Sequence, residues 1–389
     1  SNSSKKTTHT LLLRELSVLK IIHATEIDIG GTATVINLLM QSQVVDGKIS
    51  LSKCVAPERI SDALDSNLMQ HITTFKRTGR NPKSLVYFAI ALTKAIWKDD
   101  PDIVHLHSTF AGIIGRLMLI LLKPFRNPKV VYCPHGFSFL MEGSALKRKL
   151  FSRLEILLSY VTTQIICVSY YEKKAAIQAG ISSDKLTVVY NGTPPVKIQK
   201  KNHSSPYTAQ ANSINYLFAG RFDRAKGFDT LLSAIPKIKS DNIHFTVAGI
   251  SADEVPAEAR LPNITYLGWM NSKDLTPYFA HADALVLPSR WEGFPMVVLE
   301  AMSMGVSVIA SNCTSLSEAV DHQVTGLLFS TANAEELSDA ISNTSIHSLR
   351  EMGSNGFIRF NEKFTSTLMT SSTLNLYSEL LKNHSKDKI

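Results

Sequence analysis

The feature that most constrains the fold is an alternation of short apolar runs with helix-length segments, which occurs twice along the chain. In the first half, runs rich in Val and Ile are separated by segments long enough to form helices. This pattern is typical of a parallel sheet covered by helices. The expected strands of this half are residues 18–23, 103–106, 130–133, 165–168 and 186–190.

A polar stretch separates the two halves. Residues 193–213 open with Thr-Pro-Pro and then hold Lys, Ser and Asn with almost no large apolar side chain, which is typical of a linker. After it, the alternation restarts, with expected strands at residues 214–218, 244–248, 264–267, 284–287 and 306–310. Two doubly wound α/β domains follow, and ligands in such sheets bind beyond the carboxyl ends of the strands.

The length of the chain agrees with this division. With 389 residues, 44% hydrophobic and 19% charged, the chain has globular composition and is too long for one compact core. We therefore expect an N-terminal domain over residues 1–192, a linker over 193–213 and a C-terminal domain over 214–365. Residues 366–389 are expected to form a helix that packs back towards the N-terminal domain.

The composition argues against a membrane span and a disulfide framework. The most lipid-like stretch, residues 113–122, is short and is interrupted by Arg116, and the polar residues 1–10 do not make a secretory signal. Four cysteines lie far apart, with no C-x-x-C spacing and no zinc pattern: Cys54, Cys133, Cys167 and Cys313. Free thiols in a cytoplasmic protein are the expectation.

The positive charge is concentrated in the first half of the chain. Residues 1–192 hold 24 Lys+Arg against 14 Asp+Glu, and residues 193–389 hold 17 against 19, so the halves carry +10 and −2. Such charge attracts anionic lipid, nucleic acid or a phosphorylated substrate, or is simply solvated. The basic and apolar segment 146–158 suits either an anionic bilayer or a domain helix with snorkelling lysines. Contact with the inner face of the cytoplasmic membrane is therefore a hypothesis, whereas no aromatic-interleaved basic motif indicates nucleic acid.

The sharpest motif runs from Pro288 to Met302 and contains two glutamates. Pro295 suits the first turn of a helix, which places Glu292 in the loop before the helix and Glu300 roughly 7.5 Å beyond Pro295. They are therefore not a paired acid and base. A helix start suits a phosphate, so the glutamates would accept hydrogen bonds from hydroxyls of a sugar and a ribose. The alternative is a capping acid and an exposed helix residue.

This motif resembles the E-x-x-x-x-x-x-x-E element of glycosyltransferase family 4, retaining enzymes of the GT-B fold with two Rossmann-like domains facing each other across a cleft. The resemblance implies that the first glutamate and its loop contact the donor sugar and that the second glutamate binds the ribose. The residues that it assigns to the donor here are Glu292, Gly293, Phe294, Pro295, Met296, Val297 and Glu300.

A second motif follows the expected strand 214–218. The chain passes through Gly220, Arg221 and Lys226 into a helical segment. A planar guanidinium and an ammonium together suit a diphosphate that gains negative charge as its glycosyl bond breaks, although such loop cations are commonly just solvated. The segment resembles the family's Gly-Arg…Lys-Gly element, which implies that these residues lie at the donor phosphates.

Two weaker motifs lie in the N-terminal half. Gly30 and Gly31 allow close approach of backbone to a ligand and resemble the family's first glycine loop, which faces donor phosphate and acceptor, but residues 32–34 depart from its usual acidic and basic continuation. His135 with Gly136 resembles the His-Gly element whose histidine approaches the transferred sugar. We expect hydrogen bonding from His135 rather than general base catalysis, although a lone histidine after a strand is more often structural.

No metal or other cofactor is expected. Residues 100–102 spell Asp-Pro-Asp, the spacing by which other glycosyltransferases hold a divalent ion. They precede a strand, however, and the proline is typical of strand entry. His105 and His107, in the expected strand and directly after it, receive no role.

The family implies transfer of a glycosyl group from a UDP- or GDP-sugar to a hydroxyl with retained anomeric configuration. A glycan or lipid-linked glycan of bacterial surface polysaccharide, such as O-antigen, lipopolysaccharide, capsule or exopolysaccharide, is the expected acceptor. Since no side chain is an evident nucleophile, front-face transfer assisted by the departing diphosphate is expected, and the catalytic residues are His135, Arg221, Lys226 and Glu292. Alternatives are a sugar-nucleotide epimerase of the same fold and a non-catalytic nucleotide-sugar-binding protein.

Overall fold

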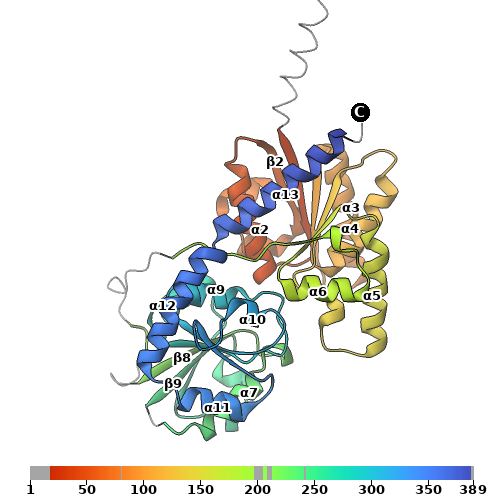
Figure 1. Cartoon of the computed structure of the whole chain (residues 1–389). Helices are drawn as coiled ribbons and strands as arrows, with labels where there is room; N and C mark the ends of the chain where they lie inside the picture. The colour runs from red at the N-terminus through yellow and green to blue at the C-terminus, as the bar shows by residue number, and fades with distance from the viewer. Residues whose placement is uncertain (1–17, 80, 197–204, 208–212, 241, 387–389) are drawn as a thin grey trace, which may run out of the picture. The chain divides into compact units, whose positions relative to one another are not determined.

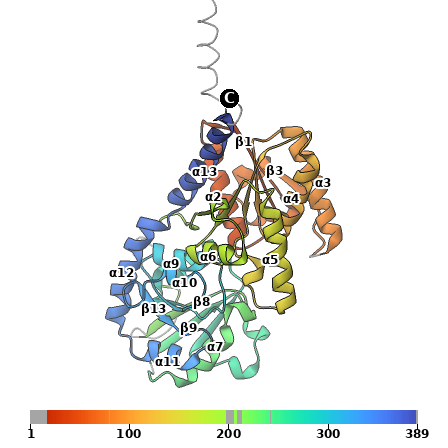
Figure 2. The same cartoon turned by 45° about the vertical axis from the view of Figure 1, so that its right-hand side comes forward.

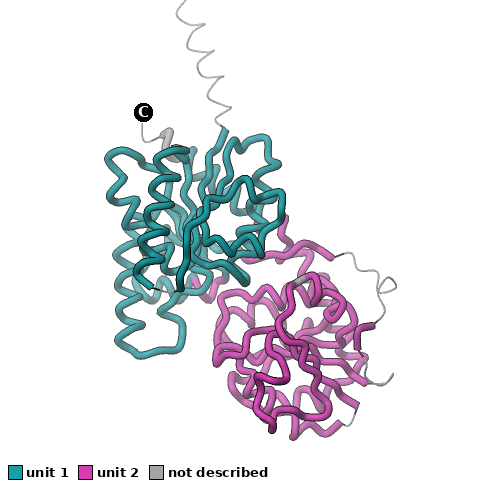
Figure 3. The backbone as a smooth tube through the Cα atoms, turned by 180° about the vertical axis from the view of Figure 1, so that it is seen from behind, with its two compact units in different colours: residues 1–168, 173–189, 370–389 teal, residues 169–172, 190–369 magenta. Residues whose placement is uncertain are grey.

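The computed structural model describes residues 18–79, 81–196, 205–207, 213–240 and 242–386. The chain divides into two compact units, coloured separately in Figure 3. Unit 1 takes its described residues from 1–168, 173–189 and 370–389, and unit 2 from 169–172 and 190–369. The boundary thus lies three residues before the expected 193, and the expected polar N-terminus and most of the expected linker lie outside the described residues.

Unit 1 is built on a seven-stranded parallel sheet in the order β3-β2-β1-β4-β5-β6-β7. Its strands are β1 Leu19–Thr25, β2 Ile49–Pro57, β3 Ile72–Phe75, β4 Ile103–His107, β5 Lys129–Cys133, β6 Gln164–Cys167 and β7 Leu186–Val188. The helices along this part of the chain are α2 Gly31–Val44, α3 Pro82–Asp99, α4 Thr109–Leu122, α5 Ala145–Ser159 and α6 Tyr170–Ala179. Helix α13, Ser366–Lys386, belongs to unit 1 from residue 370 onward.

Alternation along β4 decides which side chains face which helices. Val104 and Leu106 join the large core that also contains residues of α3 and α4. His105 and His107 therefore lie on the opposite face, because successive side chains of a strand point to opposite sides. On that face α2 packs onto β2 and α13 brings in Tyr377, as Figures 1 and 2 show for the two helices.

A buried ion pair joins α4 to α5. The guanidinium of Arg116 donates to Glu155 at 2.8 Å and to the Gly112 carbonyl at 2.7 Å, and it stacks over the Tyr132 ring at 4.0 Å from the centroid. The Tyr132 hydroxyl donates to the other carboxylate oxygen of Glu155 at 2.9 Å. The charge that interrupts the apolar run 113–122 is thus neutralised inside the unit. Among the described residues, no helix combines the length and the apolar character that crossing a membrane requires.

Unit 2 is built on a six-stranded parallel sheet in the order β10-β9-β8-β11-β12-β13. Its strands are β8 Ile214–Ala219, β9 Ile243–Ala248, β10 Ile264–Gly268, β11 Ala284–Leu287, β12 Ser307–Ser311 and β13 Gly326–Phe329. Its helices are α7 Phe228–Ala234, α8 Ser272–His281, α9 Met296–Ser303, α10 Leu316–Ala319, α11 Ala334–Ser342 and α12 Ile346–Lys363. The expected α/β fold of two Rossmann-like units is confirmed.

Both sheets reverse their strand order once. In unit 1 the reversal lies between β1 and β4, and in unit 2 between β8 and β11. At such a switch point the connections leave in opposite directions, which opens a crevice at the carboxyl ends of the strands. These two edges are where functional side chains are to be sought.

Candidate functional site

Lys226 and Glu292 meet across the switch point of unit 2. Lys226 ends a short 3-10 turn after β8, and Glu292 lies in the loop after β11, 66 residues later. Their Nζ and Oε1 atoms are 2.6 Å apart, with the side chains 19% and 10% exposed. The ion pair is therefore largely shielded, yet it stands on two loops rather than in the core.

The loops after β11 and β12 orient the Glu292 carboxylate. Ser289 donates its hydroxyl hydrogen to Oε1 at 2.6 Å, and the Glu292 backbone N–H donates to Thr314 Oγ1 at 3.0 Å. Among the described residues, Oε2 has no hydrogen-bond partner. One oxygen is thus held by the protein, and the other is available to a ligand hydroxyl.

Close backbone contact explains why the two loops meet. Gly227 has φ 63°, and a Cβ there would lie 1.9 Å from the carbonyl oxygen of Pro288, so no other residue fits. Arg290 braces the same junction, since its backbone N–H donates to the Ala225 carbonyl at 2.7 Å. Its guanidinium forms a bidentate pair with Asp229 at 2.8 and 2.7 Å.

Arg221 lies at the same edge but has another partner. Its guanidinium pairs with Asp223 at 2.8 Å, and its side chain is 60% exposed. Asp223 also caps the 3-10 turn by accepting from the Lys226 backbone N–H at 3.2 Å. Gly220 lies against the Lys226 stem, because a Cβ there would be 3.4 Å from Lys226 Cγ. The structure thus brings Lys226 and Glu292 into direct contact and leaves Arg221 as a neighbouring, exposed cation.

The remaining expected donor residues lie at the start of α9. Pro295 precedes the helix as its N-cap, with φ −75°, so the helix begins one residue later than expected. Phe294 is buried, packs against Tyr190 and accepts a hydrogen bond from Asn191 Nδ2 at 3.0 Å through its carbonyl. The half-buried members of the set are Gly293, Met296, Val297 and Glu300. Their contacts with a donor stay predictions.

The glycine loop and His135 lie at the carboxyl edge of the unit 1 sheet. Gly30 has φ 87° and open space where a Cβ would point, while Gly31 is already the first residue of α2. His135 follows β5 with φ 54°, a left-handed conformation that is strained for a residue with a Cβ. Its Nε2 lies 3.0 Å from Nδ1 of His107. His107, which received no role from the sequence, thus contacts His135, the histidine that was expected at the site.

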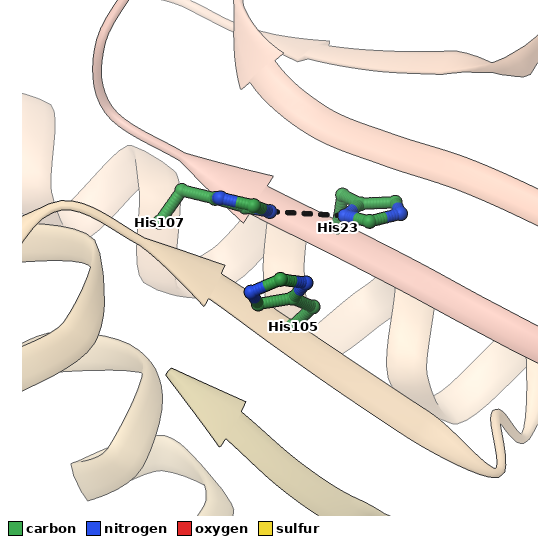
Figure 4. A group of neighbouring side chains, drawn as sticks. All are labelled: His23, His105 and His107. Carbon is green, nitrogen blue, oxygen red and sulfur yellow. Dashed lines mark hydrogen bonds between the residues drawn. The ribbon is translucent and has the colours of Figure 1, made fainter. Parts of the chain in front are cut away.

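Three more histidines are buried behind His135. His23 on β1 and His105 and His107 on β4 face one another, as Figure 4 shows. Burial lowers the pKa of His23 and of His135 to about 4, and it lowers the pKa of His105 and His107 well below the ordinary value. All four rings are therefore neutral at neutral pH.

Three histidines with ligand atoms within 4.8 Å of one another are also the composition of a metal site. However, the His105 and His107 rings contact each other with centroids only 4.0 Å apart and their planes tilted by 33°. Two imidazoles bound to one tetrahedral zinc, each about 2.1 Å from it, would hold their centroids about 5 Å apart. The rings are arranged for contact with each other. The Asp-x-Asp pair has structural partners, since Asp102 accepts from the Lys20 N–H at 2.9 Å and Asp100 pairs with Arg126 at 3.0 Å.

Sequence reasoning missed several polar groups at these edges. In unit 2 these are Ser289, Arg290 and Thr314, and in unit 1 Glu26, His23 and Gln43. Glu26 directly follows β1 and is buried against the start of α4. There it accepts hydrogen bonds from the Ala111 N–H at 2.9 Å and from the Ser108 hydroxyl, and burial raises its pKa. A search for polar residues directly after each strand would have found Glu26 and Ser289.

Comparisons with known proteins identify the family of the chain. Residues 213–345 match the family described as Glycosyl transferases group 1, and residues 53–197 match Glycosyltransferase Family 4. An uncharacterized 41.2 kDa protein in the cps region of Klebsiella pneumoniae is 35% identical over 370 residues, covering 92% of this chain and 99% of that protein.

Two further relatives are informative. The UDP-Gal:alpha-D-GlcNAc-diphosphoundecaprenol alpha-1,3-galactosyltransferase of Escherichia coli is 27% identical over 272 residues, or 65% of this chain and 68% of that protein. The structure of sucrose-phosphate synthase from Thermosynechococcus elongatus superposes with a TM-score of 0.74 at 20% identity, covering 94% of this chain and 100% of that one. The fold is thus that of GT-B proteins, and the chain belongs to glycosyltransferase family 4, the group 1 glycosyl transferases.

Proposed function

We propose that this glycosyltransferase moves a sugar from a UDP- or GDP-sugar to a hydroxyl of a glycan or lipid-linked glycan, with retained anomeric configuration, in bacterial surface polysaccharide synthesis. The observation that carries the proposal is the ion pair between Lys226 and Glu292 across the unit 2 switch point, at 2.6 Å. It supports the proposal because a cation and a hydroxyl acceptor at the carboxyl edge of such a sheet suit the diphosphate and the sugar ring of a nucleotide sugar.

Donor binding would exchange the partners of this pair. The Lys226 ammonium has three hydrogens and, among the described residues, one partner, Glu292. A diphosphate would take over the ammonium and free Glu292 to accept from a sugar hydroxyl. Arg221 has a 60% exposed side chain and would turn from Asp223 to the phosphates, and Glu300 would accept from the ribose.

The reaction breaks the bond between the anomeric carbon and the phosphate oxygen, and the bonding electrons go to the diphosphate. The acceptor oxygen bonds to the anomeric carbon on the same face, and its proton passes to the departing phosphate oxygen. The site contributes positive charge where negative charge develops, through Lys226 and Arg221. These cations would neutralise the diphosphate without a metal ion, and His135 would hold the sugar by a hydrogen bond.

The E. coli relative supports a UDP-sugar and a lipid-linked acceptor, because its name states both. The relative in the Klebsiella cps region supports a capsular setting for the proposal.

We include peripheral contact with an anionic membrane in the proposal. Along α5, Leu146, Leu150 and Leu157 are 80%, 64% and 65% exposed, and with exposed Arg153 they recur every three or four residues along one helix face. The cations at 147–149 are exposed beside them. An apolar stripe flanked by cations suits the headgroup region of an anionic bilayer.

Membrane contact is tested by flotation with liposomes that contain phosphatidylglycerol. The triple variant Leu146→Ser, Leu150→Ser, Leu157→Ser should stay soluble where the wild type floats, and Val45→Ser, at a position 81% exposed, is the matched control. A wild type that never floats, or a triple variant that floats equally, contradicts this part of the proposal.

The donor is tested by thermal shift with a panel of nucleotides and nucleotide sugars, followed by transfer assays. A ligand at 100 times its Kd stabilises the native state by about 2.7 kcal/mol, so the true donor class should raise the apparent Tm selectively. NMR of the product should show retained configuration. Consumption of the donor without acceptor would indicate an epimerase, and binding without consumption under any acceptor would indicate a non-catalytic protein.

A further inference from the structure

A line of hydrogen bonds runs from His135 into unit 1. Its Nε2 lies 3.0 Å from His107 Nδ1, and His107 Nε2 lies 3.0 Å from His23 Nδ1, the contact drawn as a dashed line in Figure 4. His23 Nε2 lies 2.9 Å from the side-chain oxygen of Gln43 on α2. Every histidine of this line contributes both ring nitrogens except His135, whose Nδ1 has no partner among the described residues.

The far end of the line determines where the hydrogens lie. An amide oxygen only accepts, and Oε1 of Gln43 already accepts from the Ser52 hydroxyl at 2.8 Å. His23 must therefore carry its hydrogen on Nε2. A neutral imidazole has one hydrogen, so His23 Nδ1 accepts from His107 Nε2, and His107 Nδ1 in turn accepts from His135 Nε2.

Two contacts set this orientation of the Gln43 amide. Its oxygen lies within hydrogen-bond distance of the Ser52 hydroxyl and of His23 Nε2, whereas its buried nitrogen has no hydrogen-bond partner among the described residues. On the same face of the sheet, the Tyr377 hydroxyl lies 2.6 Å from His105 Nδ1, and burial raises the pKa of Tyr377 well above its ordinary value.

We propose that His107, His23 and Gln43 are positioning residues that hold His135 in the tautomer with its hydrogen on Nε2, so that Nδ1 is a fixed acceptor for a ligand hydroxyl. This rests on the proposed function, in which the hydroxyl belongs to the transferred sugar. His135 would then select a hydroxyl at that position and reject a group that cannot donate. A fixed acceptor also loses no binding free energy to a change of tautomer.

The tautomer is measured directly on the full-length protein without ligand. Two-bond ¹H–¹⁵N correlation spectra of ¹⁵N-histidine-labelled protein distinguish Nε2–H from Nδ1–H, and loss of signals in His135→Asn assigns the ring. We expect His23, His107 and His135 all in the Nε2–H form. A wild-type His135 in the Nδ1–H form overturns the inference whether or not the protein transfers sugar.

Gln43→Met tests the anchor, because it removes the accepting oxygen at similar volume. We expect mixed tautomers at His135 and a kcat for transfer about 10-fold lower with little change in KM, the size of effect typical of groups that orient a site residue. Ser52→Ala is the matched control, since it leaves the oxygen free to accept from His23, and its His135 tautomer should be unchanged.

Three outcomes separate the explanations. Reduced kcat in Gln43→Met with an unchanged His135 tautomer shows a merely structural role and overturns the inference. One equivalent of zinc that shifts the ring signals of His23, His105 and His107 together shows a metal site and also overturns it. If the protein shows the expected tautomers but transfers no sugar from any nucleotide sugar, the line of hydrogen bonds is confirmed and the proposed function is wrong.

Discussion

The two switch points have the same topology and opposite chemistry. In unit 1, β1 and β4 carry His23, His105 and His107, which are buried, neutral and bonded to one another or to polar neighbours. In unit 2, the loops after β8 and β11 carry an ammonium and a carboxylate that are partly exposed. At the switch point itself, unit 1 presents neutral imidazoles and unit 2 presents a pair of opposite charges, and the ion pair of the unit 1 edge, Asp28 with Arg77 at 2.8 Å, stands on the loops after β1 and β3.

The difference follows from where the side chains stand. The unit 1 histidines lie on the strands themselves, within a covered face of the sheet, where desolvation removes charge. Lys226 and Glu292 stand on loops beyond the strand ends, where water and ligands reach them. A fully buried ion pair of unit 1 lies instead between α4 and α5, where Arg116 pairs with Glu155 at 2.8 Å. A paired charge at a loop edge is thus available to a ligand, whereas a paired charge in a core is a packing element.

The largest effect should come from the core pair. Arg116→Met leaves Glu155 buried without its cation and should lower the free energy of unfolding by about 3–5 kcal/mol. Urea denaturation measures this. The double variant Arg116→Met with Glu155→Leu removes both charges and should recover most of the loss. If Arg116→Met lowered the free energy of unfolding by less than about 1 kcal/mol, the core pair would not differ in stability effect from the loop pair of Lys226 with Glu292.

Breaking the loop pair should affect turnover rather than folding. Lys226→Ala removes the charge proposed to meet the departing diphosphate, so kcat/KM for transfer should fall about 10²–10³-fold, while the free energy of unfolding should fall by only about 1–2 kcal/mol, since Glu292 keeps its hydrogen bond from Ser289. Steady-state kinetics and urea denaturation on the same preparation test both halves. Unchanged turnover, or a loss of stability as large as that of Arg116→Met, would show that Lys226 has a structural role like that of Arg116.

Acid should destabilise unit 1 through its buried neutral histidines. Burial lowers the pKa of His23 from 6.5 to about 4, so between these values the unfolded chain binds more protons than the native one. The contribution of His23 is fully present above pH 6.5 and is lost as the pH falls towards 4. In His23→Gln the pH dependence of the free energy of unfolding should flatten by up to about 1.4 kcal/mol per pH unit in this window. An identical slope in wild type and variant would mean that His23 titrates normally in the native state.

The smallest effect is expected at the exposed pair of Lys237 with Glu335 in unit 2, where the side chains are 43% and 71% exposed. Lys237→Ala should change stability by less than about 0.5 kcal/mol and leave turnover unchanged. It is the matched control for Lys226→Ala, because it removes the same charge from the same unit. If Lys237→Ala reduced turnover as much as Lys226→Ala, the effect of Lys226→Ala would come from the changed net charge and not from the position of Lys226.

Much of the fold was predictable because buried parallel strands are short apolar runs. Strands β2, β3 and β13 were missed: β2 interleaves polar residues in Ile-Ser-Leu-Ser-Lys, and β3 is a four-residue edge strand. The motifs placed Lys226 and Glu292 on strand-end loops, but their contact depends on which strands are neighbours. The histidine cluster depends on register, since His23 lies opposite His105 only through the pairing of β1 with β4. Neither relation is local in sequence.

Helix α13 has a consequence for the order in which the protein is made. Its residues from 370 onward complete unit 1, where Tyr377 is buried against His105, yet a ribosome synthesises them after the whole of unit 2. Domains commonly fold in the order in which they are translated. Here the face of the unit 1 sheet that carries His23, His105 and His107 would stay exposed to solvent until α13 is synthesised. Unit 1 would therefore start to fold before unit 2 and complete its folding after it.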